Sequence, residues 1–334
     1  MRKSFYLLLL CLLYSLSVES ADLEINGIRY NVDITTMEAS VVSGEYDYRN
    51  IIIPSTVDYN GRSFSVTGIG ERAFDGSKVQ TILIPHSVKY IAQGAFNSNK
   101  YLKNLVIPNS IVRIETSNFI EVQDSLIFED GEETLVINEG YAEKITFISR
   151  FVAKYLYVGR NLWGDGIFSD YPSISVSLST VDILEYGDNI VKMLPVYHYN
   201  FWNGTFRGTF HTLILGKKIE YLESMNQNEN LKTIICKMQN PIGFDKEYFS
   251  TQQYMNVEVH IPQGSLTQYT NSEGWKYFFV YKEEQALGLQ NIEAEKTNKG
   301  IWTLGGMKVR EGFQKHNGSK GDIYIIDGKK AIVK

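Results

Sequence analysis

The sequence has little cysteine, no excess of basic residues and no apolar run long enough for a membrane helix. Only 2 of its 334 residues are cysteine, which excludes a disulfide scaffold and a zinc site built from cysteines. Its 33 Lys and Arg are outnumbered by 38 Asp and Glu, so nothing indicates a nucleic-acid partner. With 43% hydrophobic and 21% charged residues, the composition is nevertheless that of a folded protein.

The N-terminus has the pattern of an export signal. Arg2 and Lys3 precede an apolar run from Phe5 to Leu16, which at about twelve residues is too short to span a bilayer. Small residues follow, so we predict a signal peptide over residues 1–20 that is cleaved after Ser20. The mature protein is expected outside the cell or on the outer-membrane surface rather than in the periplasm, with no transmembrane span.

Signal cleavage would also remove Cys11 and leave Cys236 as the only cysteine. No internal disulfide can then form. Because its neighbours Ile234 and Ile235 are apolar, we expect Cys236 to be a packed, unreactive thiol.

A short repeat fills the first third of the mature chain. The segment Val66–Phe74, which contains an Ile-Gly step and ends in Ala-Phe, returns as Val88–Phe96 and more weakly as Ile111–Phe119, at spacings of 22 and 23 residues. A unit of this length cannot bury its own apolar side, so it must stack on its neighbours. Each unit also contains a strand-like run closed by proline, which has no N–H for the ladder. These runs are Ile51–Pro54, Ile82–Pro85 and Leu105–Pro108.

The alternation of side chains in a strand predicts which residues face the inside of the stack. Ile82 and Ile84 should point inward, together with the equivalent residues of the next unit. On the far side of the coil, Phe74, Phe96 and Phe119 are expected to form an aromatic column.

The Ile-Pro, Ile-Gly and Ala-Phe steps resemble those of the BspA-like leucine-rich repeat family of bacterial surface and secreted proteins. The Asn60–Gly61 hairpin is similar to that family's N-terminal cap, and Val259–Ser265 also resembles the family. The resemblance covers roughly residues 22–285 and is specific in its first third. It implies a β-rich solenoid: a right-handed leucine-rich repeat coil with short strands on the concave face and irregular or short helical turns on the convex face.

The middle of the chain departs from this pattern. Glycine replaces proline in three units, Leu156–Gly159, Leu184–Gly187 and Leu213–Gly216, which lie 28 and 29 residues apart and so have longer loops. Ahead of them, Asp130–Gly131 between two alternating apolar runs predicts a hairpin across Leu126–Ile137 that projects from, or replaces, a coil.

The C-terminal residues form a separate unit. Strand candidates lie at Ile301–Val309 and Asp322–Val333, and the segment resembles the short C-terminal module of exported Bacteroidetes-type proteins. It is expected either to cap the solenoid or to act in sorting. The predicted division is a signal peptide (1–20), a solenoid (21–285, with its N-terminal cap over about 21–50), a polar linker (286–300) and a C-terminal β tail (301–334).

Signals for catalysis, cofactors and metal ions are weak. Gly68–Ala73 satisfies a loose dinucleotide fingerprint, but the next copy of the repeat lacks its glycines, so the repeat explains it. No two of the 5 histidines lie within five residues of each other, and the acidic run Glu129–Glu133 lacks the spacing of a calcium loop. No Gly-x-Ser-x-Gly motif occurs. We therefore predict a protein that is not an enzyme and needs neither cofactor nor metal.

The candidate site is instead a surface. On each strand the residue between two inward positions should face the concave side, which gives one mainly apolar row and one polar row. Such a face suits a protein or peptide ligand, although the preference of strands for β-branched residues explains the same composition. The predicted contact row is Ile52, Leu83, Val106, Tyr157, Ile214, Ile235 and His260, with Glu185 between Tyr157 and Ile214. The polar row is Asn50, Thr81, Asn104, Tyr155, Thr212, Thr233 and Glu258.

A second candidate is the aromatic loop at residues 197–206, which has five aromatic residues in ten. Tyr197, Tyr199 and Trp202 could stack on a sugar or anchor a protein. Alternatively, the loop fills the core, with Phe201 or Phe206 as the inward aromatic residue of its coil.

These expectations predict a non-catalytic, secreted or cell-surface binding protein. The family resemblance implies adhesion to host matrix proteins or to other bacteria, through a protein or peptide ligand on the concave face. A glycan-binding or glycan-processing accessory protein that uses the aromatic loop is the alternative, and a purely architectural spacer is a third.

Overall fold

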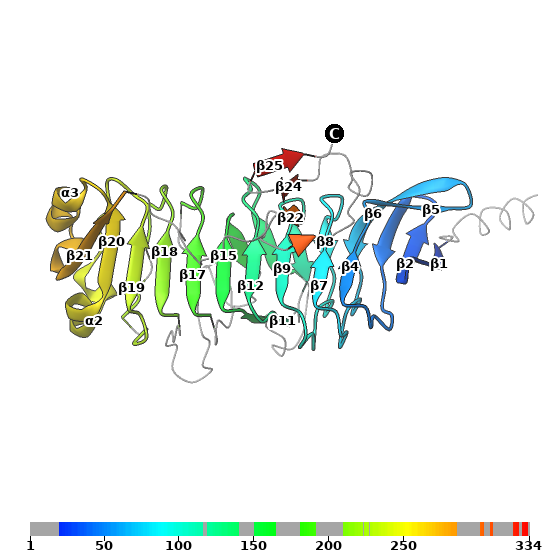
Figure 1. Cartoon of the computed structure of the whole chain (residues 1–334), viewed down its shortest axis with the longest axis horizontal. Coiled ribbons are helices and arrows are strands. Elements are labelled where there is room, and N and C mark those ends of the chain that lie inside the picture. The colour runs from blue at the N-terminus through cyan, green and yellow to red at the C-terminus, as the bar shows by residue number, and fades with distance from the viewer. Residues whose placement is uncertain are drawn as a thin grey trace, which may run out of the picture.

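The protein is an elongated coil whose two long sides are β-sheets, as the computed structural model shows (Figure 1). Because the coils stack along one axis, the strands of each coil pair with those of its neighbours, as expected for a solenoid. The structure describes residues 20–115, 119–139, 150–164, 181–191, 210–222, 224–226, 228–285, 301–303, 308–309, 323–326 and 329–332.

The first long side is a ten-stranded parallel sheet, which we call the front sheet. Its strands follow one another in space in the same order as in the sequence, one from each coil (Figure 1). They are β4 (Asn50–Ile52), β7 (Thr81–Leu83), β9 (Asn104–Ile107), β12 (Ser125–Phe128), β15 (Tyr155–Val158), β17 (Ile183–Tyr186), β18 (Thr212–Leu215), β19 (Thr233–Cys236), β20 (Glu258–Pro262) and β21 (Val280–Glu284).

The second long side is a nine-stranded sheet, the back sheet. Three antiparallel strands begin it: β1 (Ser20–Ile25), β2 (Ile28–Asp33) and β3 (Glu38–Val41). Parallel strands from successive coils continue it: β6 (Arg62–Ile69), β8 (Tyr90–Ile91), β10 (Arg113–Glu115), β13 (Leu135–Glu139) and β16 (Leu162–Gly164). β5 (Thr56–Tyr59) pairs with β6 through the expected turn, in which Asn60 and Gly61 both have positive φ.

The repeats contain more strand than expected. Away from the Pro-closed strands, irregular or short helical turns were expected, but Ile69, Ile91 and Ile114 end or occupy β6, β8 and β10 of the back sheet. A further short pair, β11 (Phe119–Glu121) with β14 (Arg150–Val152), is also parallel. A strand forms here because stacking places each step beside its copy in the next coil, where both can share a ladder.

Helical turns close the C-terminal end of the coil (Figure 1). They are η2 (Lys246–Tyr248), α2 (Thr251–Asn256), α3 (Leu266–Asn271) and η3 (Trp275–Tyr277). Ser250 and Gln253 form a capping box at the start of α2. The fully buried Trp275 donates from Nε1 to the Ile242 carbonyl at 2.7 Å and meets the Phe244 ring edge-on at 5.0 Å. This aromatic cap covers the apolar interior that the last coil would otherwise expose.

The core lies between the two sheets and follows the predicted alternation. Ile82 is 1% exposed, while Ile84 is only partly buried. The Phe74 and Phe96 rings stack at 5.7 Å, as expected, and the column extends to Tyr46, whose ring lies 5.0 Å from that of Phe74. The Phe119 side chain lies outside the described residues.

The hairpin expected across Leu126–Ile137 is wrong. β12 joins the front sheet between β9 and β15, whereas β13 joins the back sheet between β10 and β16, and all these pairings are parallel. Asp130–Gly131 therefore turns the chain from one sheet to the other and does not return it alongside itself. The segment is an ordinary coil, because pairing with neighbouring coils on both sides gives each strand two ladders where a hairpin gives one.

Cys236 is buried as expected, and burial raises the pKa of its thiol. Four C-terminal strands, β22 (Ile301–Thr303), β23 (Lys308–Val309), β24 (Ile323–Ile326) and β25 (Lys329–Ile332), form an antiparallel sheet of their own. The predicted signal peptide up to residue 19, the aromatic loop and the linker lie outside the described residues. Among those described, no helix is long and apolar enough to cross a membrane.

Candidate functional site

The outward face of the front sheet, here the front face, carries both predicted rows in register. Leu83 pairs with Ile52, and from Tyr157 to His260 each residue of the contact row pairs with the next. Ile127 stands between Val106 and Tyr157, and Lys282 follows His260. Ile127 is absent from the predicted row because its segment was predicted to form a hairpin. Ser125 and Ile183 likewise complete the polar row.

The first four strands present two uncharged stripes. Ile52 is 52% exposed, and the next three members of its row are partly exposed. In the polar stripe, Asn104 Oδ1 accepts hydrogen bonds from the Ser125 hydroxyl at 2.6 Å and from the Ser125 N–H at 3.1 Å. The apolar stripe comprises Ile52, Leu83, Val106 and Ile127, and the polar stripe comprises Asn50, Thr81, Asn104 and Ser125.

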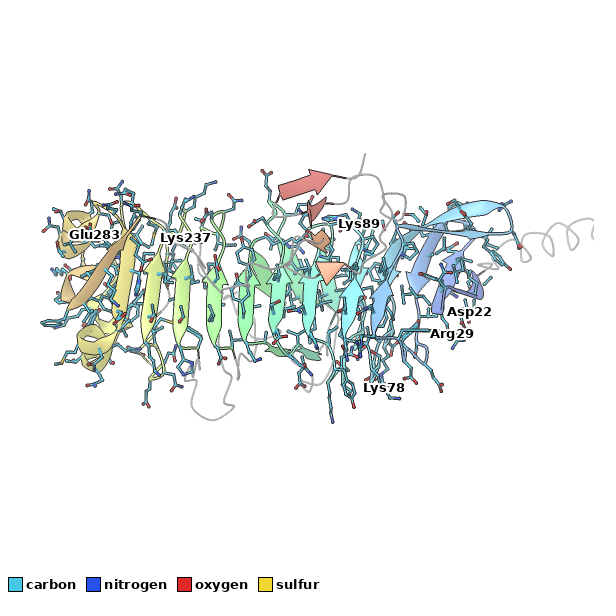
Figure 2. The ribbon with its side chains drawn as sticks, viewed as in Figure 1. Asp22, Arg29, Lys78, Lys89, Lys237 and Glu283 are labelled. Carbon is cyan, nitrogen blue, oxygen red and sulfur yellow. The ribbon has the colours of Figure 1, made fainter. Side chains whose placement is uncertain are left out.

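The middle of the face is closed by an ion pair. Lys237 follows β19 at the carboxyl end of the front strands (Figure 2), and its Nζ lies 2.6 Å from Glu185 Oε1 on β17. Because β18 lies between those two strands, the Lys237 side chain crosses it. Ile214 of β18 is 0% exposed, so its predicted role in partner contact is wrong for this structure. The sequence alone does not predict this ion pair over Ile214, because Lys237 and Glu185 are 52 residues apart.

The glycines that replace proline make this crossing possible. A Cβ on Gly216 would lie 2.1 Å from the Gly187 carbonyl oxygen, and one on Gly187 would lie 2.6 Å from the Tyr157 hydroxyl. Gly159 is equally crowded, with Phe128 O and Asp130 N at 2.6 Å. The three glycines therefore let adjacent coils approach closely and leave room for long polar side chains above them.

Tyrosines and carboxylates occupy that room. Tyr155 donates to Glu185 Oε2 and Tyr157 donates to Asp130 Oδ1, both at 2.7 Å. Burial, together with these carboxylates, raises the pKa of both tyrosines, so the rings stay neutral hydrogen-bond donors. We call the group the central network; it comprises Asp130, Tyr155, Tyr157, Glu185, Asp188, Lys217 and Lys237.

Asp188 completes the central network on the side of β18. Its Oδ2 lies 2.9 Å from Lys217 Nζ, and its Oδ1 lies 3.9 Å from Lys237 Nζ. Burial opposes ionisation of Asp188, but the hydrogen bond from Lys217 and the charge of Lys237 hold its pKa below the usual value. The network contains three carboxylates and two ammonium groups, so its net charge is negative.

At the C-terminal end of the face, His260 is bound to acidic neighbours. Its Nδ1 contacts Glu284 Oε1, and its Nε2 lies 3.4 Å from Glu258 Oε2. Lys282 Nζ is 2.6 Å from the same Glu258 oxygen, and the hydrogen bonds from Lys282 and His260 lower the pKa of Glu258. This end of the face is charged, unlike the β4–β12 end.

A buried arginine supports the turn that holds Asp130. Arg160 donates to the Asn109 carbonyl at 2.8 Å and to the Pro108 carbonyl at 3.0 Å, and only 1% of the residue is exposed. Burial lowers its pKa to about 10, although Glu129 and Glu133 act in the opposite direction. Two hydrogen bonds thus join the coil of β15 to that of β9, across the coil of β12.

The described residues offer little to a metal ion. Among them, no group of three or more His, Cys, Asp or Glu side chains is arranged to hold one. Tyr197, Tyr199 and Trp202 of the aromatic loop lie outside the described residues, so their predicted role stays a prediction. What the geometry offers is an extended, uncharged face next to a negatively charged network.

Comparisons with known proteins agree with the repeat pattern. Residues 21–130 match the model of the BspA type leucine rich repeat region in six copies. No curated protein matches the chain. The chain is similar to the solved structure of a leucine-rich repeat protein from Bacteroides capillosus, with 15% identity, 43% of this chain and 99% of that chain covered, and a TM-score of 0.32.

Two further solved structures are similar. One is a leucine rich cell surface protein from Faecalibacterium prausnitzii, with 12% identity, 80% of this chain and 95% of that chain covered, and a TM-score of 0.30. The other is the pneumococcal vaccine antigen PcpA, with 15% identity, 80% and 99% covered, and a TM-score of 0.25.

Proposed function

We propose that this chain, whose residues 21–130 form a BspA-type leucine-rich repeat region, is a non-catalytic binding protein of the cell surface or the secreted fraction. Its ligand is a protein or peptide, such as a host matrix protein or a component of another bacterial surface. The front face binds it, and the role is adhesion.

The observation that carries the proposal is the apolar stripe. A soluble protein normally scatters its exposed apolar side chains, whereas here Ile52, Leu83, Val106 and Ile127 form one continuous row across four strands. The neighbouring polar stripe offers uncharged hydrogen-bonding groups. An uncharged face of this kind costs little to desolvate, which favours contact with another protein.

The test is a screen of the mature protein on arrays of matrix proteins, bacterial surface proteins and glycans, followed by a face variant. Leu83→Lys, Val106→Lys and Ile127→Lys together should weaken binding to the protein found by roughly 100-fold or more, because three charges would be buried without partners. Affinity is measured by surface plasmon resonance, and the melting temperature should remain close to that of the wild type.

The matched control is Val112→Lys with Val136→Lys on the back-sheet side, where both side chains are also partly or fully exposed. It adds the same kind of charge outside the front face and should leave affinity unchanged. Full affinity in the face variant, or equal losses in both variants, would show that the front face is not the binding site.

The glycan-binding alternative rests on the aromatic loop and is separated by the same arrays. If a sugar binds the wild type and the face variant but not Trp202→Ala, the glycan-binding alternative is supported and the front face is not the binding site. If nothing on any array binds, the architectural spacer is favoured.

Export is a part of the proposal that can be tested directly. Strand β1 begins at Ser20, so cleavage after Ser20 would retain all but the first residue of the strand that starts the back sheet. N-terminal sequencing of protein recovered from outside the cells should therefore begin at Ala21. Recovery only inside the cells, with Met1 intact, would contradict export.

A further inference from the structure

The solenoid and the C-terminal tail carry opposite charges. Residues 21–285 contain 22 basic and 32 acidic residues, which gives a net charge of −10. Residues 301–334 contain 7 basic and 3 acidic residues, which gives a net charge of +4. Two bodies of opposite charge on one chain attract each other at low ionic strength.

The tail also has the sequence of a sheet that needs a partner surface. Strand β24 reads Ile-Tyr-Ile-Ile and has no charged or small polar position. A strand with one face in water alternates apolar and polar residues, whereas a continuous apolar run is typical of a strand covered on both faces. The described residues of the tail form one antiparallel sheet, and a second layer packed on it would bury this apolar run.

The front face has both properties that would complement the tail, an apolar surface and nearby negative charge. The apolar stripe is uncovered enough to leave Ile52 half exposed. At its end, the turn after β12 contributes Glu129, Asp130, Glu132 and Glu133, of which Glu129 also contacts His86 at 3.0 Å. The other charged groups of the central network, Glu185, Asp188, Lys217 and Lys237, balance one another. The turn after the next front strand, β15, contains one basic residue, Arg160. Its side chain is buried and donates hydrogen bonds to backbone carbonyls. A basic, apolar sheet is therefore complementary to this part of the face.

The linker is long enough for the tail to reach this surface within one chain. From β21 back to β9 is seven strand positions, or about 34 Å at ~4.8 Å per position. The 15 residues of the linker can span up to about 50 Å when extended.

We propose that the tail, residues 301–334, docks on the front face of its own chain, over the apolar stripe and beside the acidic turn after β12. Docking covers the apolar residues of both surfaces and brings the +4 tail against the carboxylates of the turn after β12. The tail then competes with any external ligand for the same stripe. It is a cover for the proposed binding site, and it departs when a ligand or high salt displaces it.

The test uses the full mature chain with a protease recognition sequence placed in the linker, between residues 286 and 300. After cleavage, the mixture is passed over a size-exclusion column at low and at high ionic strength. The wild-type tail should co-elute with the solenoid at low ionic strength and separate at high ionic strength. In the Leu83→Lys, Val106→Lys, Ile127→Lys variant the tail should separate at both, because lysines on the face repel a basic tail.

The Val112→Lys, Val136→Lys variant is the matched control and should retain the tail at low ionic strength. Circular dichroism melting of the uncleaved chains confirms that each variant is folded. Separation of the wild-type tail at low ionic strength would overturn docking, and so would a tail that stays bound to the folded face variant.

Docking and the proposed function fail separately. The column experiment contains no ligand, so it supports or overturns docking even if the arrays find no partner. Where a partner is found, deletion of residues 301–334 should raise its affinity; if the tail covers the stripe nine-tenths of the time, the gain is about 10-fold. An unchanged affinity after deletion would show that the tail does not compete for this face.

Discussion

Replacement of Phe96 by alanine is expected to lower the free energy of unfolding by about 3–5 kcal/mol. The Phe96 ring is fully buried and stacks on Phe74 at 5.7 Å, in the column that joins successive coils. Its removal leaves a cavity that the coils cannot close, because Phe74 N is hydrogen-bonded to the carbonyl of Ala95 at 2.8 Å and holds the two turns in place. The loss is measured from the shift of the urea unfolding curve.

The control for this prediction is Tyr101→Ala in the same coil, where the side chain is 52% exposed. Surface substitutions of this kind usually change stability by no more than about 0.5 kcal/mol. If both variants unfold at the same urea concentration, the aromatic column does not hold the coils together.

Alanine at Gly216 is expected to cost about 3 kcal/mol or more, since a new Cβ would lie 2.1 Å from the Gly187 carbonyl oxygen. That oxygen belongs to the backbone of the adjacent coil, so no flexible side chain can move aside. The two coils must separate, which also weakens the contact between Lys237 and Glu185 across β18. Thermal melting followed by circular dichroism measures the loss.

Gly243→Ala provides the comparison. Its new Cβ would meet Glu273 Cβ at 3.5 Å, an ordinary contact, and the backbone there does not have positive φ. Alanine at such a position should be neutral or stabilising by less than about 1 kcal/mol, because it restricts the unfolded chain. Equal melting temperatures for the two glycine variants would refute the close approach of the coils at Gly216.

Much of the fold was predictable because the repeat is written in consecutive residues. The Pro-closed runs place β4, β7 and β9, and the Ala-Phe pairs place Phe74 and Phe96 in one column. The error at Leu126–Ile137 arose because Asp130–Gly131 has the same local signature in a hairpin and in a turn between two sheets. Only the neighbouring coils, which pair with β12 and β13 on both sides, distinguish them.

The sequence predicted which residues lie on the front face, but not which of them are exposed to solvent. Strand alternation correctly placed Ile52, Leu83 and Val106 on it. The same rule placed Ile214 there, yet that residue is buried beneath the Lys237–Glu185 ion pair. Alternation says which side of a sheet a residue faces, and it contains no information about a long side chain that reaches over from the end of a neighbouring strand.

The order of residues by itself determined the solenoid, its front strands and its aromatic column, because these depend on spacings of 22 or 23 residues between similar units. Tertiary structure alone decided which part of the face is open. Exposure depends on contacts between residues such as Lys237 and Glu185, which lie 52 positions apart and meet only after the coils have stacked. The stripe of β4–β12 remains accessible, with Ile52 52% exposed, although Glu129 reaches His86 across the coil of β9 at 3.0 Å.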